Sequence, residues 1–182
     1  MSRKYKFSDN NKLYFISFAV VYWIDLFIRR EYKEIVLESW RYCQREKDSD
    51  IYSWCIMPRH VHVIIGSKGR PLDKIVGEIK SFTSRELRKA IAEHPGESKK
   101  EWLVWLMERA GMRNNNNNDW QLWQQHNKPI ETLNIEMFYQ KMEYIHKNAV
   151  EAGFVENEED YLYSSARDFF NKKGLIELSY VV

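Results

Sequence analysis

Two apolar segments separated by only two residues place the strongest constraint on the fold. Residues 51–57 and 60–66 are both rich in β-branched and other apolar side chains, and only Pro58 and Arg59 lie between them. So short a connection allows two strands to pair only as an antiparallel hairpin, and the proline ends the first strand. The chain is therefore expected to build an antiparallel sheet around this hairpin.

The remaining segments predict further strands and helices around the hairpin. A β-branched and aromatic run predicts a strand over 14–23, and residues 120–130 predict a fourth strand that runs into a turn at Pro129. Apolar residues at helical spacing predict helices over 30–46, from 71 to a stop at 94–96, and from an Asn134 cap to Gly153. This order predicts a ferredoxin-like α+β sandwich, in which helices pack on a central antiparallel sheet. The buried stripe expected for the second helix is Leu72, Ile75, Val76, Ile79, Phe82, Leu87 and Ile91.

Length and composition limit the class of protein. With 182 residues, 44% of them hydrophobic, residues 1–182 suit a single domain. The 28 basic and 26 acidic residues leave a net charge of +2, which neither requires nor excludes nucleic acid. Cys43 and Cys55 are expected to be buried small hydrophobes in a reducing cytosol. Without a signal peptide or a membrane-length apolar run, we expect a cytoplasmic protein with no membrane partner.

Two regions are expected to differ from the compact domain. Around residues 97–119 the sequence indicates a short helix near Trp102 to Leu106, then the asparagine run 114–118, which favours turns and predicts a mobile insertion. The acidic, aromatic tail 154–182 is expected to pack back on the domain.

His60 and His62 are candidate metal ligands. Because strand side chains alternate, both imidazoles project to one face while Val61 and Val63 project to the other, and their Cβ atoms would lie roughly 6.5–7 Å apart. This spacing alone is also compatible with a plain strand that carries two half-buried histidines. The metal interpretation gains from the apolar setting, because unpaired buried imidazoles are unfavourable.

Tyr144 and Asn148 are four residues apart on the last predicted helix and therefore share one face. A helix packed on the sheet could present this phenol and this amide oxygen toward the histidines, and an amide oxygen is an acceptable ligand for Mg²⁺ or Mn²⁺. Tyr139 with Glu143 is a rival pair at the same spacing. His146 is expected to have a polar surface role, and Tyr161 and Tyr163 are expected to be packing residues.

The segments 54–65 (WCIMPRHVHVII) and 144–155 (YIHKNAVEAGFV) resemble the two signature blocks of the single-tyrosine HUH transposases, which include insertion-sequence and REP-associated tyrosine transposases. The resemblance extends over about residues 14–170. Ala149 stands where many relatives have proline, which should leave the helix continuous.

The resemblance implies a metal-dependent enzyme that cleaves and rejoins single-stranded DNA with hairpin-containing ends. His60, His62 and Asn148 would hold Mg²⁺ or Mn²⁺, and Tyr144 would form a 5′-phosphotyrosine intermediate. Relatives are dimers, so a homodimer is expected. In some of them the tyrosine helix serves the partner's histidines, and both arrangements remain open for this sequence.

Candidate DNA contacts lie on the second helix and on the predicted fourth strand. A solvated helix face that includes Glu78 and Glu86 would explain the basic residues equally well, but residues 80–84 resemble the corresponding family segment. Aromatic side chains on the strand could stack on bases or fill the core. The candidates are Lys74, Lys80, Ser81, Thr83, Arg85, Arg88, Trp120, Trp123 and His126.

Two other functions share parts of this pattern. One is a non-catalytic or domesticated regulator that binds single-stranded nucleic acid. The other is a histidine-metal hydrolase without a covalent intermediate. The complete set of His60, His62, Tyr144 and Asn148 favours strand transfer, because a binding module does not need all four.

Overall fold

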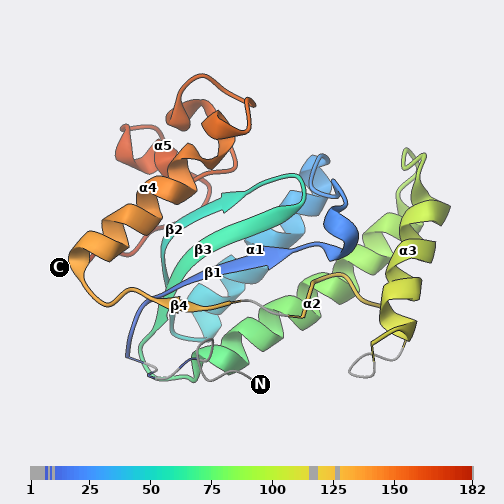
Figure 1. Cartoon of the computed structure of the whole chain (residues 1–182), viewed down its shortest axis with the longest axis horizontal. Coiled ribbons are helices and arrows are strands. Elements are labelled where there is room, and N and C mark those ends of the chain that lie inside the picture. The colour runs from blue at the N-terminus through green and yellow to red at the C-terminus, as the bar shows by residue number, and fades with distance from the viewer. Residues whose placement is uncertain (1–6, 8, 10, 115–118, 126–127, 182) are drawn as a thin grey trace.

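Four strands form the central sheet in the computed structural model, which describes residues 7, 9, 11–114, 119–125 and 128–181 (Figure 1). Their order is β2-β3-β1-β4, and all neighbouring strands are antiparallel, as in a ferredoxin-like sheet. The predicted hairpin is confirmed: β2 and β3 pair, and the Met57 amide donates to the His60 carbonyl at 2.9 Å. The strands are β1 Tyr14–Ala19, β2 Ser49–Ile56, β3 His60–Ser67 and β4 Ile130–Glu131.

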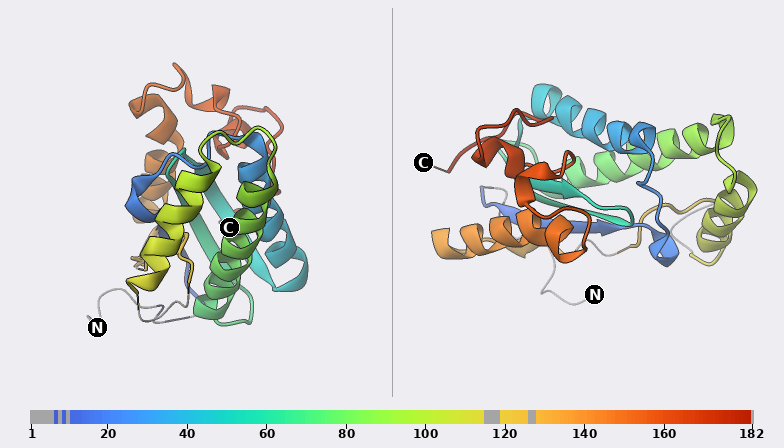
Figure 2. Two further views of the ribbon diagram at one scale, coloured as in Figure 1. Left: turned by 90° about the vertical axis from the view of Figure 1, so that its right-hand side faces the viewer. Right: turned by 90° about the horizontal axis from the view of Figure 1, so that it is seen from above.

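Helices cover both faces of the sheet. From above, α1 and α2 lie on one side of the strands and α4 lies on the other (Figure 2). The bounds of the first, second and fourth helices agree with the sequence prediction to within a residue or two. The helices are α1 Arg30–Glu46, α2 Leu72–Glu93, α3 Lys100–Met112, α4 Ile135–Glu151 and α5 Ala166–Phe169, with single 3-10 turns at η2 Val21–Trp23 and η3 Glu158–Asp160.

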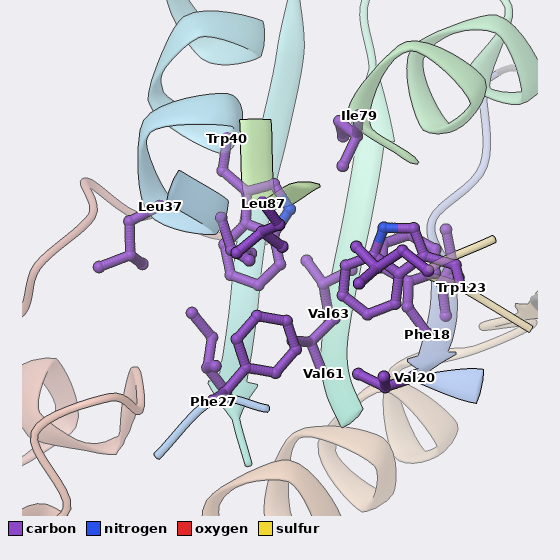
Figure 3. Packing of buried hydrophobic residues seen from close by; sticks show 14 of the residues in the cluster. Phe18, Val20, Phe27, Leu37, Trp40, Val61, Val63, Ile79, Leu87 and Trp123 are labelled. Atoms are coloured by element: carbon purple, nitrogen blue, oxygen red, sulfur yellow. The ribbon is translucent and has the colours of Figure 1, made fainter. Parts of the chain in front are cut away.

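The alternation of β3 divides the interior into two cores. Val61 and Val63 point into the larger core, which is filled by side chains from α1 and α2 (Figure 3). Ile64 points the other way, into a smaller core that Ile145 and Ala149 of α4 close. The larger core includes Phe18, Leu37, Trp40, Ile79, Leu87 and Trp123, all buried.

Both predicted caps of α4 are present. The Asn134 side chain accepts a hydrogen bond from the Met137 amide at 2.8 Å. At the other end Gly153 adopts a left-handed φ of 74°, and the Phe154 amide donates to the Ala149 carbonyl at 2.9 Å, which completes a Schellman motif. The helix is continuous through Ala149.

The first and fourth strands are shorter than predicted. β1 ends at Ala19, after which the chain turns into η2. The predicted strand over 120–130 is interrupted: Val21 donates to the Leu122 carbonyl and Gln124 donates to the Ala19 carbonyl, both at 2.8 Å, but β4 itself contains only two residues. Lys128 has a left-handed φ of 42°, which breaks the extended conformation between these pieces.

Much of the region predicted as a mobile insertion is helical. α3 packs on α2, and Leu103 and Met107 are buried in the larger core. Residues 115–118 of the asparagine run lie outside the described residues.

Three predicted DNA contacts are instead core residues. Thr83, not Phe82, continues the buried stripe of α2, because it follows Ile79 by four residues and Phe82 projects outward. The Thr83 hydroxyl accepts a hydrogen bond from the Trp123 indole at 2.8 Å. Trp120 is buried under the Arg88 guanidinium, which lies 5.0 Å from its ring centroid. Thr83, Trp120 and Trp123 are therefore not available to contact DNA.

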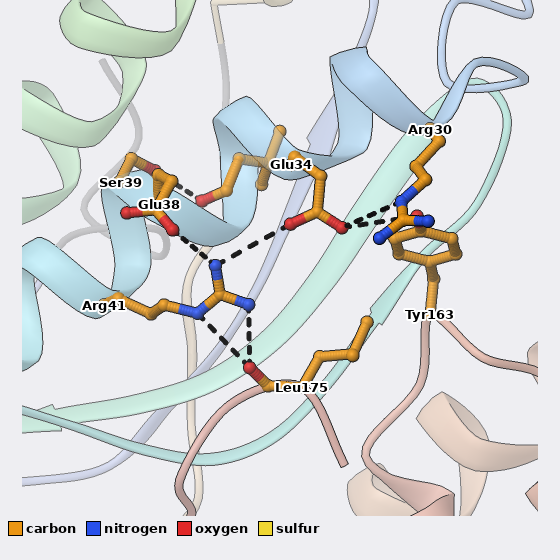
Figure 4. A network of polar contacts seen from close by, with 8 residues as sticks. Arg30, Glu34, Glu38, Ser39, Arg41, Tyr163 and Leu175 are labelled. Carbon is orange, nitrogen blue, oxygen red and sulfur yellow. Dashed lines mark hydrogen bonds and ion pairs between the residues drawn. The ribbon is translucent and has the colours of Figure 1, made fainter.

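The tail packs back on the domain, as predicted, and it does so along the free edge of β2. Ser164 forms a β-bridge with Cys55, and the Ser179 amide donates to the Ile51 carbonyl at 2.8 Å. A polar network then attaches the tail to α1: Arg41 donates to the Leu175 carbonyl at 2.9 Å and pairs with Glu38 (Figure 4). The edge of β2 is thereby protected from pairing with other chains.

The two cysteines are buried free thiols, as expected, and burial raises the pKa of Cys43 to about 11 and of Cys55 to about 12. Among the helices in the described ranges, none combines the length and the apolar character that crossing a bilayer requires.

Two glycine substitutions test the helix boundaries. A Cβ added at Gly153 or at Gly77 meets no atom within 4 Å, so only the backbone conformation differs between the sites. Gly153→Ala should reduce the free energy of unfolding by about 1–2 kcal/mol because of its left-handed φ. Gly77→Ala, within α2, should raise it by about 0.5–1 kcal/mol. Urea denaturation measures both, and equal effects at the two sites would contradict the assigned end of α4.

A second substitution tests the buried position of Thr83. Thr83→Val keeps the shape but leaves the Trp123 indole without its acceptor, which should cost about 1–3 kcal/mol of stability. Ser81→Ala, at an exposed position of the same helix, should change stability by less than about 0.5 kcal/mol. If both variants unfold at the wild-type urea concentration, the hydrogen bond has no structural role.

Candidate active site

The pairing of β1 with β3 places two histidines side by side on the face that α4 covers. His62 lies opposite Ser17, and His60 lies opposite Ala19. Their ring centroids are 4.6 Å apart with the planes inclined at 66°. The sequence prediction that both imidazoles share one face is confirmed by this geometry.

Each imidazole buries one nitrogen that has no hydrogen-bond partner among the described residues: Nδ1 of His60 and Nε2 of His62. Burial lowers the pKa of His60, and it lowers the pKa of His62 to about 3, so both rings are neutral at pH 7. A neutral imidazole has one lone pair that can bind a metal ion. Buried polar nitrogens without partners are unusual in folded proteins, and a ligand would remove the deficit.

Ser17 determines which His62 nitrogen is free. Its hydroxyl lies 2.7 Å from Nδ1 of His62. When Nδ1 carries the proton and donates to Ser17, the lone pair is on Nε2, the buried nitrogen without a partner. A second hydrogen bond of this kind is the usual way in which a metal-binding histidine is oriented.

Tyr144 of α4 lies against the same histidine. Its ring centroid is 5.2 Å from that of His62 and 5.8 Å from that of Phe15, edge-on to both. The side chain is 44% exposed, so a large ligand can reach it from solvent. The packing of α4 on the sheet therefore holds a phenol beside the two imidazoles within one chain.

Asn148 follows Tyr144 by one helical turn, and its side chain partly offsets the lowering of the His60 pKa that burial causes. No group of three histidine, cysteine, aspartate or glutamate side chains able to hold a metal occurs in the described part of the chain. A third protein ligand for an ion between the histidines would thus be the Asn148 amide oxygen, which suits Mg²⁺ or Mn²⁺.

Three further residues belong to this site, and the sequence analysis did not identify them. Ser17 and Phe15 come from β1, and the Phe15 ring stacks on His62 at 5.4 Å. Lys141 precedes Tyr144 by three residues on α4, and its Nζ lies 5.3 Å from the Phe15 ring centroid. Ser17 is a polar interruption of an apolar strand, which could have indicated a site; the other two have no comparable signal.

The rival tyrosines are placed differently. Tyr139 is exposed and packs on Phe138, while Glu143 pairs with Lys147. Tyr161 donates to the Ile56 carbonyl at 2.8 Å, and Tyr163 is buried, so both act in packing.

His146 corrects another expectation, because it is buried rather than on the surface. Its Nε2 lies 2.9 Å from Ser165 Oγ and 3.2 Å from Ser53 Oγ, and burial lowers its pKa to about 4. This histidine joins α4 to β2 and to the tail.

The basic residues of α2 lie on the other layer of the sandwich, so the sheet separates them from the histidine face. Lys80 donates to the Gln124 carbonyl at 2.8 Å, and Arg88 bonds to Asp119 at 3.0 Å, so both have structural partners. His126 lies outside the described residues. Lys74, Ser81 and Arg85 are exposed.

Comparisons with known proteins identify a matching sequence family and similar solved structures. A family model described as "Transposase IS200 like" matches residues 14–105, half of the chain, a range that includes both histidines and ends before α4. The solved structure of a REP-associated tyrosine transposase bound to a REP hairpin is similar, with 16% identity and a TM-score of 0.66, over 100% of this chain and 94% of that chain. A protein of Deinococcus radiodurans assigned as a transposase has 16% identity and a TM-score of 0.44, over 79% and 95% of the two chains. No curated protein matches.

The structural likeness, at this low identity, supports the α+β fold with its open antiparallel sheet. The family match rests on the sequence of the first three strands and of the first two helices, and it includes the histidine pair of β3. This chain belongs to the IS200-like transposase family.

Proposed function

We propose that this transposase cleaves and rejoins single-stranded DNA through a covalent bond between Tyr144 and a 5′-phosphate, with Mg²⁺ or Mn²⁺ held by His60, His62 and Asn148. The observation that carries the proposal is the pair of buried, unpartnered imidazole nitrogens beside the Tyr144 ring. Buried polar nitrogens without hydrogen-bond partners are unusual in folded proteins, and a bound ligand would supply the missing partner.

The donor set fits a divalent cation. Two neutral imidazoles and an amide oxygen are uncharged, so the ion would keep its full positive charge toward a phosphate. A bound ion would polarise a non-bridging phosphate oxygen and offset the charge that develops on it.

The side chains of this chain position the remaining participants. The contacts of the Tyr144 ring with His62 and Phe15 limit its orientation, while its exposed part admits a DNA strand. Lys141, one turn earlier on α4, places a second positive charge near the phenol, where it can attract the phosphate.

The chemical step exchanges one phosphate ester for another. Tyr144 Oη forms a bond to phosphorus as the bond from phosphorus to the 3′ oxygen breaks, and the electron pair of that bond leaves with the 3′ oxygen. The phenol loses one proton and the departing strand gains one as a 3′-hydroxyl, so no water or other reactant is consumed. A second 3′-hydroxyl can reverse the step and join two strands.

We further propose that the substrate is single-stranded DNA that carries a hairpin. The REP-associated relative was solved with a REP hairpin, and it shares the fold over the whole length of this chain. The tyrosine and histidines of one chain already adjoin each other, so the chemistry does not require residues from a second copy, whether or not the protein forms the expected homodimer.

The nucleophile is tested by covalent adduct formation. Wild-type protein and a library of hairpin oligonucleotides with randomised flanks, incubated with Mn²⁺, should yield an adduct whose modified peptide contains Tyr144. Tyr144→Phe should reduce adduct formation by about 10³-fold or more. Tyr139→Phe, an exposed tyrosine of the same helix, serves as the matched control and should react normally. A persistent adduct in Tyr144→Phe would refute the assignment, and binding without any cleavage by wild type would favour the regulator.

The orientation of His62 is tested through metal affinity. Ser17→Ala removes the partner of Nδ1, and the affinity for Mn²⁺ should fall by about 10-fold or more in titration calorimetry. Ser39→Ala removes a buried serine hydroxyl that donates to the Val36 carbonyl of α1, and it should leave the affinity unchanged. Wild-type affinity in Ser17→Ala would show that this hydrogen bond does not serve a metal site.

A further inference from the structure

A cavity of about 770 Å³ lies between the segment after β1 and the region of α3. The segment over 22–28 forms one wall and residues of 97–113 form the other. In Figure 1 these two segments occupy the same end of the molecule, beyond the end of β1. The lining includes four large aromatic side chains, Tyr22, Trp23, Tyr32 and Trp102, and several cations, among them Lys99, Arg109 and Arg113.

Tyr22 and Trp23 are held in an unfavourable backbone conformation. Their φ angles are 56° and 55°, in the left-handed region that bulky residues rarely adopt. The neighbouring chain maintains this turn, because Val21 donates to the Leu122 carbonyl and Trp23 donates to the Val20 carbonyl at 3.1 Å. Yet both side chains are exposed, Tyr22 by 48% and Trp23 by 55%. The turn presents two aromatic rings to solvent without burying them, which core packing does not explain.

The aromatic pair is continuous with the active site. The Trp23 ring lies 6.1 Å from the His60 ring, edge-on at 72°. A flat group stacked on Trp23 would therefore sit directly beside the histidine pair. The cavity lining includes Trp23 but not His60, His62 or Tyr144, so a strand that passes the histidines can continue past Trp23 into the cavity.

The charges of the cavity favour a polyanion. Arg29 is paired with Glu97 at 2.7 Å and Asp25 with Arg59 at 3.1 Å, so the two acidic residues of the lining are neutralised. Lys99, Arg109 and Arg113 have no carboxylate within 4.0 Å in the portion of the chain that the structure describes. Exposed aromatic rings interleaved with unpaired cations are the combination that binds single-stranded nucleic acid, with bases stacked on the rings and phosphates on the cations.

We propose that Tyr22 and Trp23 form a base-stacking subsite that holds the nucleotides flanking the scissile phosphate, and that Lys99, Arg109 and Arg113 bind the following phosphates. This inference rests on the proposed function, since it names where the single strand lies. It also replaces Trp120 and Trp123, which are buried, with aromatic residues that DNA can reach.

The affinity for a cleavable oligonucleotide, measured by fluorescence anisotropy in EDTA so that no cleavage occurs, tests the subsite. Trp23→Gly removes the ring but suits the left-handed φ, so it should weaken binding about tenfold without lowering the melting temperature. Trp23→Phe keeps a stacking surface and should remain within about threefold of wild type. Tyr42→Ala, an equally exposed aromatic on α1 outside the cavity, is the control and should bind normally.

A photo-cross-link gives a readout independent of affinity. Oligonucleotides with 5-iodouracil next to the scissile phosphate should attach to Tyr22 or Trp23, identified by peptide mass spectrometry. Wild-type affinity in Trp23→Gly, or cross-links confined to α2, would overturn the subsite even if wild type cleaves DNA. Concentration-dependent dimerisation that Trp23→Gly abolishes, with DNA affinity unchanged, would assign the cavity to a second copy and overturn it too. Failure of wild type to bind or cleave any oligonucleotide would overturn the proposed function itself.

Discussion

The antiparallel register between β1 and β3 is the constraint on which the other features depend. The pairing of Tyr14 with Ile65 continues without a shift to Ala19 and His60. This register directs Val61 and Val63 toward α1 and α2, and it directs His62 toward Ser17 and α4. Because strand side chains alternate, a slip of one residue would bury the imidazoles in the larger core and turn the valines toward α4. The same set of backbone hydrogen bonds therefore determines both the core and the candidate active site.

The two layers of the sandwich have different roles. The larger core beneath α1 and α2 contains most of the buried aromatic side chains and provides most of the hydrophobic stabilisation. The layer formed by α4 buries fewer residues and is held additionally by polar contacts. His146 links it to Ser53 of β2 and to Ser165 of the tail, and Arg41 of α1 holds the tail through the Leu175 carbonyl. The contacts of His146 hold α4 on the sheet, while Tyr144 of the same helix packs against His62 and Phe15 and stays partly exposed.

Local patterns predicted the parts of this structure that local forces determine. Helix periodicity located α1, and the preference of glycine for left-handed φ located the end of α4 at Gly153. Positions decided by tertiary packing were harder to predict: Thr83 rather than Phe82 is buried, because the Trp123 indole needs its hydroxyl. The alternation of His60 and His62 placed both on one face, but their unpartnered nitrogens become visible only when Ser17 and α4 are in place. The sequence predicts Tyr22 and Trp23 at the end of a strand, because no local pattern indicates that the chain from Trp120 onward pairs beside them.

In the mechanism that we propose, a single chain assembles both the histidine pair and the tyrosine that acts beside it. Mixing two inactive variants tests whether one chain is enough. A chain with His62→Ala and a chain with Tyr144→Phe each lack one half of their own site, and both are incubated with the oligonucleotide that wild type cleaves. We predict that the mixture forms no more covalent adduct than either variant alone. Restored adduct formation would show that the tyrosine of one chain serves the histidines of another, and it would contradict the account.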